Sequence, residues 1–200
     1  MDSRETILSS IRKHLAASPP DLYYTDQPKS VFPESVVAPA AKSLVDLFKE
    51  NVEAVNGHCI VTRDVSQAVT RIITDLGARK IAVSDTPPSA EEIFEYDVGI
   101  TGAQAAIAET GTLVLDSARE KHRLASLVPP VHIAIVDASS IFQTLAEALA
   151  FIHQNGDISP AVTFITGPSR TADIELTLAI GVHGPQELYV IVNQGPSLSH

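Results

Sequence analysis

Cysteine is scarce in this sequence, and so are basic residues and long apolar runs. The chain has one cysteine, Cys59, which excludes a disulfide framework and an iron–sulfur cluster held by about four thiolates of this chain alone. Its 14 Lys and Arg residues are outnumbered by 24 Asp and Glu residues, and the lack of a basic stripe argues against a general nucleic-acid binder. No apolar run approaches the roughly 18–20 residues that cross a bilayer.

The sequence also lacks the usual signatures of secretion, metal binding and nucleotide binding. Residues 1–16 are amphipathic and mixed in charge, unlike a signal peptide, so we expect a soluble, cytoplasmic protein. The seven histidines are scattered, without an HxxxH or HExxH pair, and we expect no metal site. There is no Walker loop, no GxGxxG fingerprint and no GxSxG elbow.

What the sequence does contain is enough apolar material for one folded core. Of its 200 residues, 44% are hydrophobic and 19% are charged, with a formal net charge of −10, which fits one domain of about 100–200 residues. Residues 1–39 combine a predicted helix at 3–17 with a proline-rich arm from residue 18 to 39. We therefore expect an N-terminal helix and arm, followed by a single domain over residues 40–200.

From residue 40 onward, helical and strand patterns alternate. The patterns predict helices over 40–54, 64–76, 88–95, 139–153 and 170–180. They predict strands over 58–62, 80–84, 98–101, 112–116, 131–137, 162–166 and 188–193. Residues 103–109 are ambiguous between strand and helix. Strands rich in valine and isoleucine that alternate with helices favour an α/β fold, with a mostly parallel sheet and helices on both faces.

Residues 161–185 combine a predicted strand, a polar loop and a predicted helix. The loop residues with the strongest binding chemistry are Thr166, Gly167, Ser169, Arg170 and Thr171. Free backbone N–H groups at the start of a helix attract anions, and Arg170 adds a positive charge. We expect an anion-binding loop for a small carboxylate or phosphate, at the carboxyl end of a parallel strand. The alternative is an ordinary strand-to-helix turn with good caps.

Glu109 stands in a nearly uncharged run, residues 98–115. A carboxylate among small apolar residues is costly unless it is paired or protonated, and a desolvated Glu can act as a general base, an acid or a nucleophile. Glu109 is therefore the candidate catalytic residue, with Gln104, Thr110 and Gly111 as candidate ligand contacts. The alternative is a structural Glu that accepts backbone N–H groups at the turn.

His183 and Gly184 follow the expected end of the last helix. His183 is either a ligand contact or a cap for the carbonyl groups of that helix. In open parallel sheets, ligands gather outside the carboxyl ends of the strands. We therefore expect Glu109, Arg170 and His183 to converge on one pocket there.

Three segments resemble the LUD-domain (lactate utilisation) family over roughly residues 40–193. They are GITGAQAAIAETGTLVLDS, RLASLVPPVHIAIVD and FITGPSRTADIELTLAIGVHGPQELYVIV. The resemblance implies a Rossmann-like three-layer α/β sandwich similar to the NagB/RpiA/CoA-transferase group. It also implies a non-redox accessory role in oxidation of L-lactate to pyruvate, beside iron–sulfur partner proteins that hold the clusters. It implies no cofactor in this chain and supplies no catalytic residues.

Two other functions stay open at this point. Glu109-Thr110-Gly111 is similar to the Glu-x-Gly signature of CoA-transferases, in which the Glu is the nucleophile, so the chain is alternatively an enzyme acting on an acyl-CoA or a sugar phosphate. It is also alternatively a regulatory module that binds a small carboxylate. The sequence alone decides neither the ligand, nor whether the chain is catalytic, nor its oligomeric state, nor the role of the arm.

Overall fold

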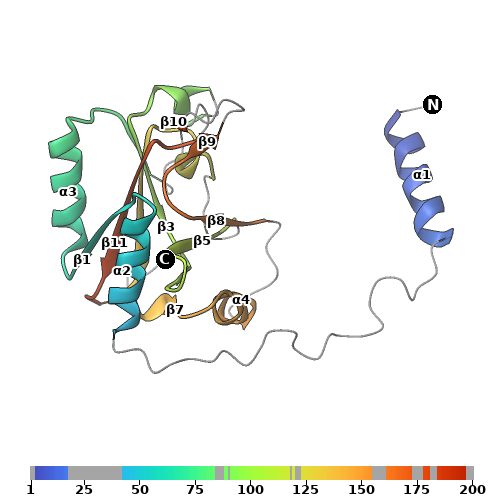
Figure 1. Ribbon diagram of the computed structural model, residues 1–200. Coiled ribbons are helices and arrows are strands. Elements are labelled where there is room, and N and C mark those ends of the chain that lie inside the picture. The colour runs from blue at the N-terminus through green and yellow to red at the C-terminus, as the bar shows by residue number, and fades with distance from the viewer. Residues whose placement is uncertain are drawn as a thin grey trace. The chain divides into compact units, whose positions relative to one another are not determined.

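Five strands pair in parallel to form the main sheet of the computed structural model, in the order β1-β11-β6-β3-β2 (Figure 1). They are β1 (His58–Thr62), β2 (Ile81–Val83), β3 (Val98–Gly102), β6 (Val131–Asp137) and β11 (Glu187–Asn193). The central strands β11 and β6 pair over their full length. The α/β fold with a mostly parallel sheet, expected from the alternation of strands and helices, is confirmed.

The structure describes residues 3–17, 42–83, 88–89, 91–117, 119, 123–154, 161–172, 178–180 and 184–196. The chain divides into two units, residues 1–40 and 41–200. The first contains helix α1 (Ser3–Ala17), as its periodicity predicts. The proline-rich arm and the expected boundary between residues 39 and 40 lie outside the described residues. Among those described, no helix is both long enough and apolar enough to cross a membrane.

Helix α3 (Val65–Leu76) covers one face of the main sheet. Its first turn is capped by Asp64, whose side chain accepts a backbone N–H, and it ends at Gly77, where φ is +64°. Its apolar stripe is centred on Ile72, which is buried against a cluster that includes Ile133 of β6. The sequence pattern predicts both ends of this helix.

Helix α2 (Leu44–Ala54) and a second sheet cover the opposite face of the main sheet. Phe48 and Val52 of α2 are fully buried. They belong to the largest apolar cluster, together with Ala134 of β6 and Leu188 of β11. The main sheet is thus buried on both faces, which explains why its strands are almost continuously apolar.

The second sheet has four strands in the order β7-β4-β5-β8. They are β4 (Ala105–Ile107), β5 (Thr112–Asp116), β7 (Ile141–Phe142) and β8 (Val162–Ile165). Strand β5 pairs antiparallel with β4 on one side and with β8 on the other, and β7 pairs parallel with β4. Leu113 of β5 faces the main sheet, while Val114 packs with Ala148 of helix α4 (Leu145–Gln154). This sheet is therefore a buried layer between the main sheet and α4.

Two sequence expectations for helices need local correction. Residues 139–153 do not form one helix, because a short 3-10 helix, η4 (Ala138–Ser140), and strand β7 come before α4. Over residues 88–95 the described helix is only η2 (Glu92–Glu95). A third 3-10 helix is η3 (Arg123–Ser126). The ambiguous run 103–109 contains the strand β4.

The helix expected over residues 170–180 is wrong. Strands β9 (Arg170–Ala172) and β10 (Leu178–Ile180) pair there as an antiparallel ribbon. The sequence contains the reason, because apolar residues alternate at positions 174, 176, 178 and 180, which is the period of a strand rather than a helix. Residues 173–177 lie outside the described part of the chain.

Burial of the inner face of the second sheet predicts a large cost for truncating Leu113, whose exposure is 0%. We expect Leu113→Ala to lower the free energy of unfolding by about 2–5 kcal/mol, since it leaves a cavity between the two sheets. Urea unfolding followed by circular dichroism measures this change. Leu149→Ala on α4 is the matched control, because Leu149 is 42% exposed, and equal costs for the two variants would contradict the packing.

Candidate functional site

A pocket of about 450 Å³ lies where the main sheet meets the loop that follows β8. Four of the residues that the sequence singles out line it: Thr166, Gly167, Ser169 and Gly184. The other lining residues come from β8, from the two loops, from the end of η3 and the residue after it, and from the amino ends of β6 and β11. The structure therefore brings together two of the three sequence motifs at one pocket, which makes it the candidate site.

The pocket lies at the amino ends of the parallel strands, not at their carboxyl ends as expected. His132 and Leu188, which line it, are the second residues of β6 and β11 and are register partners. The loop after β8 reaches this end because β8 belongs to the antiparallel part of the second sheet. The rule that places ligands at carboxyl ends applies to strands of the parallel sheet, and β8 is not one of them.

Two loops form one wall of the pocket and hold each other. The Ser169 backbone N–H donates to the Pro185 carbonyl at 2.8 Å, and a Cβ built on Gly184 would lie 3.1 Å from the Ser169 Cβ. The segment around Gly184 is thus packed directly on the loop at Ser169. Because β9 follows this loop, the helix that supplied the physical reason for anion binding is replaced by a strand, and anion binding stays a prediction.

A chain of hydroxyl groups joins this loop to the turn that contains Glu109. The Thr112 Oγ1 lies 2.7 Å from the Thr110 Oγ1 and 2.7 Å from the Thr166 Oγ1. Each hydroxyl can donate one hydrogen bond and accept another, so the three form a continuous chain. Thr110 and Thr166 are therefore tied together through Thr112, a residue that sequence reasoning did not select.

The turn from residue 108 to 111 is anchored on the end of helix α2. The Asn51 side-chain amide donates to the Ala108 carbonyl at 2.7 Å. Gly111 has φ of +65°, and a Cβ there would lie 2.5 Å from the Val52 nitrogen, so only glycine fits this turn. Gly111 is a structural residue in this position.

Glu109 and Gln104 do not line the pocket. The Glu109 side chain is exposed at the tip of the β4–β5 turn, so the expected desolvated carboxylate is wrong, because the turn carries it out of its apolar surroundings. Gln104 is buried, and its Oε1 accepts the Asp116 backbone N–H at 2.6 Å. Gln104 thus braces the two strands of the hairpin.

The remaining predicted site residues are only partly described. Arg170 and Thr171 belong to strand β9, and the structure describes their backbone but not the placement of their side chains. His183 lies outside the described residues. The convergence of Glu109, Arg170 and His183 on one pocket therefore stays a prediction. In the described residues, no group of three or more His, Cys, Asp or Glu side chains is placed to hold a metal ion.

His132 is a buried polar residue of the pocket that the sequence-based site prediction did not include. Its ring is fully buried, its Nε2 lies 2.8 Å from the Thr101 Oγ1, and its Nδ1 has no hydrogen-bond partner. Burial lowers the pKa of His132 to about 4, so the imidazole is neutral at pH 7. A signal was available, since His132 alternates with Ala134 and Val136 along β6 and so must point inward with them.

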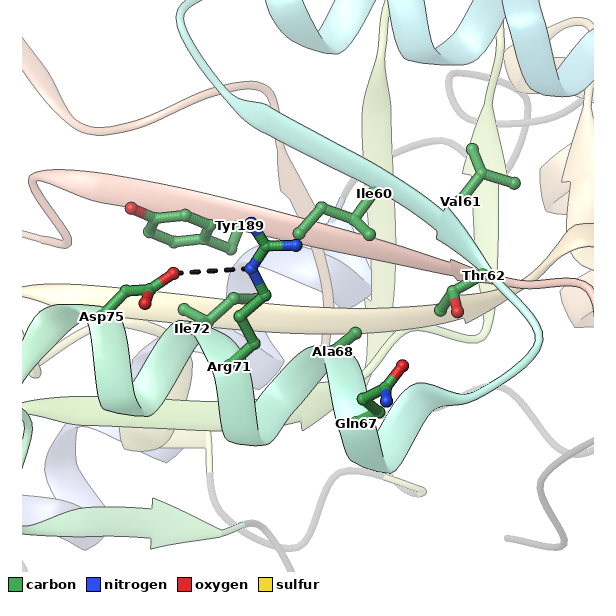
Figure 2. Close-up of a pocket in the computed structure, with 9 residues that line it drawn as sticks. All are labelled: Ile60, Val61, Thr62, Gln67, Ala68, Arg71, Ile72, Asp75 and Tyr189. Carbon is green, nitrogen blue, oxygen red and sulfur yellow. Dashed lines mark ion pairs between the residues drawn. The ribbon is translucent and has the colours of Figure 1, made fainter.

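A larger pocket, of about 710 Å³, lies beside α3 and the edge strand β1. Its floor includes Ile60 and Ile72, and Tyr189 closes one end, while Figure 2 shows Arg71 extending over it beside Asp75. The Arg71 Nε lies 3.7 Å from the Asp75 Oδ2, and both side chains are more than two-thirds exposed, at 81% and 71%. Such a pair contributes little to stability. None of the predicted site residues lines this pocket.

Comparison with known proteins identifies relatives over most of the chain. The family model of the LUD domain matches residues 78–192. A protein from Exiguobacterium sp. (strain AT1b), named "Lactate utilization protein C", is 31% identical over 96% of both chains. One of the same name from Bacillus licheniformis is 43% identical over 49% of this chain. The match spans only 43% of that relative's length.

A solved structure shares the fold. It is described as a DUF162 family protein from Deinococcus radiodurans, with 23% sequence identity and a TM-score of 0.57. The likeness covers 75% of this chain and 96% of the other. It supports the α/β sandwich described above.

The Thr112 hydroxyl links the turn at Thr110 to the loop at Thr166. Removing this hydroxyl should loosen both segments. We expect Thr112→Val, which keeps the shape of the side chain, to lower the free energy of unfolding by about 1–3 kcal/mol, because two hydrogen bonds are lost. Urea unfolding measures the change. Thr74→Val is the matched control, since the exposed Thr74 hydroxyl bonds only within α3. If Thr112→Val lowers the free energy of unfolding no more than Thr74→Val does, the three hydroxyl groups do not hold the two segments together.

The buried neutral histidine predicts a dependence of stability on pH. The pKa of His132 falls from 6.5 to about 4 on folding, so between these values the unfolded chain binds a proton that the folded chain does not. The free energy of unfolding therefore decreases as the pH falls through this range, by about 3 kcal/mol. Urea unfolding of the wild type and of His132→Phe at several pH values isolates this contribution, and parallel pH profiles would contradict it.

Proposed function

Because the chain belongs to the LUD domain family, we propose that it acts in lactate utilisation. One observation carries this proposal. A relative named "Lactate utilization protein C" matches 96% of both chains at 31% identity. The match thus includes the segments that form both the main sheet and the candidate pocket. Members related over their whole length commonly share a biochemical setting, although a shared fold alone does not establish a function.

Within that setting we propose a non-redox accessory subunit that acts with iron–sulfur partner proteins in oxidation of L-lactate to pyruvate. This oxidation releases electrons that an acceptor must take up. Cys59, the single cysteine, packs among the buried residues of the largest apolar cluster, and burial raises the pKa of its thiol to about 11. A thiol kept protonated in a core is a poor metal ligand. The buried thiol supports our assignment of cysteine-held clusters to the partners.

An accessory subunit needs surface that a partner can cover, and the described part of the chain offers exposed apolar side chains. Phe94 is 75% exposed on η2, and Phe164 is 46% exposed on β8. Leu145 and Leu149 lie one turn apart on α4 and are both 42% exposed, so they share one face of the helix. Apolar groups of this size at the surface are suited to protein contacts.

Reconstitution with the iron–sulfur partner proteins of the same organism tests this function. We expect the purified chain to bind them and to raise lactate-dependent reduction of an artificial electron acceptor by several fold, while the iron remains with the partners. Serum albumin at the same concentration controls for nonspecific protection. Cys59→Ala should raise the rate as the wild type does, because no electron passes through this thiol.

Two outcomes would contradict the proposal. A chain that neither co-elutes with the partners nor changes their rate has no accessory role. A folded Cys59→Ala variant that binds the partners but no longer raises the rate would show that the chain takes part in electron transfer. Circular dichroism of the variant separates this second outcome from simple unfolding.

A further inference from the structure

One nitrogen of His132 is buried and has no partner within the protein. The His132 ring has 0% exposure, and its Nδ1 makes no hydrogen bond. Leaving a buried polar atom unpaired destabilises the folded state, whereas an aliphatic side chain at this inward position would carry no such cost. An atom of this kind calls for an explanation.

The partner of the other ring nitrogen indicates where the proton lies. The His132 Nε2 is 2.8 Å from the Thr101 Oγ1, which is also buried. When Nε2 carries the proton and donates to the hydroxyl, Nδ1 is left with a lone pair. The opposite tautomer would bury an unpaired N–H, which folded proteins avoid more strongly than an unpaired acceptor. Nδ1 is therefore a vacant hydrogen-bond acceptor.

His132 is one of the residues that line the candidate pocket, and the other residues described there are uncharged. The residues that line the pocket beside His132 include the polar Thr163 and Thr166 and the apolar Leu127 and Phe164. The residues described as lining it include no Lys, Arg, Asp or Glu. A neutral imidazole and hydroxyl groups distinguish ligands by their hydrogen-bond donors and by their shape.

We propose that this pocket binds a small 2-hydroxy acid, whose hydroxyl group donates a hydrogen bond to the His132 Nδ1. The choice of a 2-hydroxy acid rests on the proposed role in lactate utilisation, and the need for a donor rests on the pocket alone. Thr101 acts as a positioning residue, because it holds the ring in the tautomer that accepts. Binding involves no chemical step, because the hydroxyl proton stays on the ligand.

Three probes of equal charge and similar size test the proposal. L-Lactate has the hydroxyl donor, while propionate and pyruvate lack it. In the ¹⁵N spectrum of the histidine rings, we expect L-lactate to move the Nδ1 resonance of His132 toward the position of a hydrogen-bonded nitrogen. Propionate and pyruvate should leave it in place and should bind at least tenfold more weakly. Loss of the signal in His132→Phe assigns the resonance.

The matched control is His58→Phe, since His58 is exposed on β1 and stacks on Tyr189 outside the pocket. We expect the affinity for L-lactate to fall at least tenfold in His132→Phe and to be unchanged in His58→Phe. Equal responses to all three probes would overturn the proposal in favour of a carboxylate site. No response of His132 to L-lactate would overturn it as well, and this spectrum of the wild type does not depend on whether a variant folds.

The two proposals fail in different ways. A chain that raises lactate oxidation by its partners but leaves His132 unperturbed by L-lactate retains its accessory role and lacks this pocket function. A chain that binds L-lactate through His132 but does not affect the partners has the pocket function without the accessory role.

Discussion

Burial of strand β6 on both faces is the constraint on which the rest of the structure depends. Its odd-numbered side chains pack under α3, and its even-numbered ones pack under α2 and the second sheet. Each layer on either side exists because one face of this strand must be removed from water. The amino end of the same strand brings His132, a polar ring, into that dry interior. The strand that forms the centre of the core thus also contributes a residue to the candidate pocket.

The main sheet was predictable from sequence because its strands are buried on both faces and read as short valine- and isoleucine-rich runs. Helix α3 was predictable because Asp64 and Gly77 mark its two ends. The ribbon of β9 and β10 was not predicted, because the polar residues at the start of this segment suit a helix cap. The alternation of apolar residues further along the segment is the stronger signal, and it indicates a strand. Strand β7 was not predicted because a strand of two residues is too short to show a periodic pattern.

Only some residues of the candidate site were predictable from the sequence, because others depend on contacts between distant segments. Thr166, Gly167, Ser169 and Gly184 belong to polar loops that stand out between apolar strands. The residues that hold these pieces together are remote in sequence. Thr112 and Thr166 are 54 residues apart, and Thr101 and His132 are 31 apart. Such contacts arise from sheet order, which sequence periodicity does not specify. The apolar run around Glu109 predicts a buried side chain, but the turn between β4 and β5 carries this side chain outward.

The buried position of Cys59 makes its thiol a probe of local opening in the core. Because the chain has one sulfhydryl group, every event of thiol modification reports on the same point in the core. The Cys59 side chain packs with Phe48 and Val52 of α2, so alkylation of the thiol is slow while α2 stays in place. The rate of alkylation therefore reports how often this part of the core opens locally.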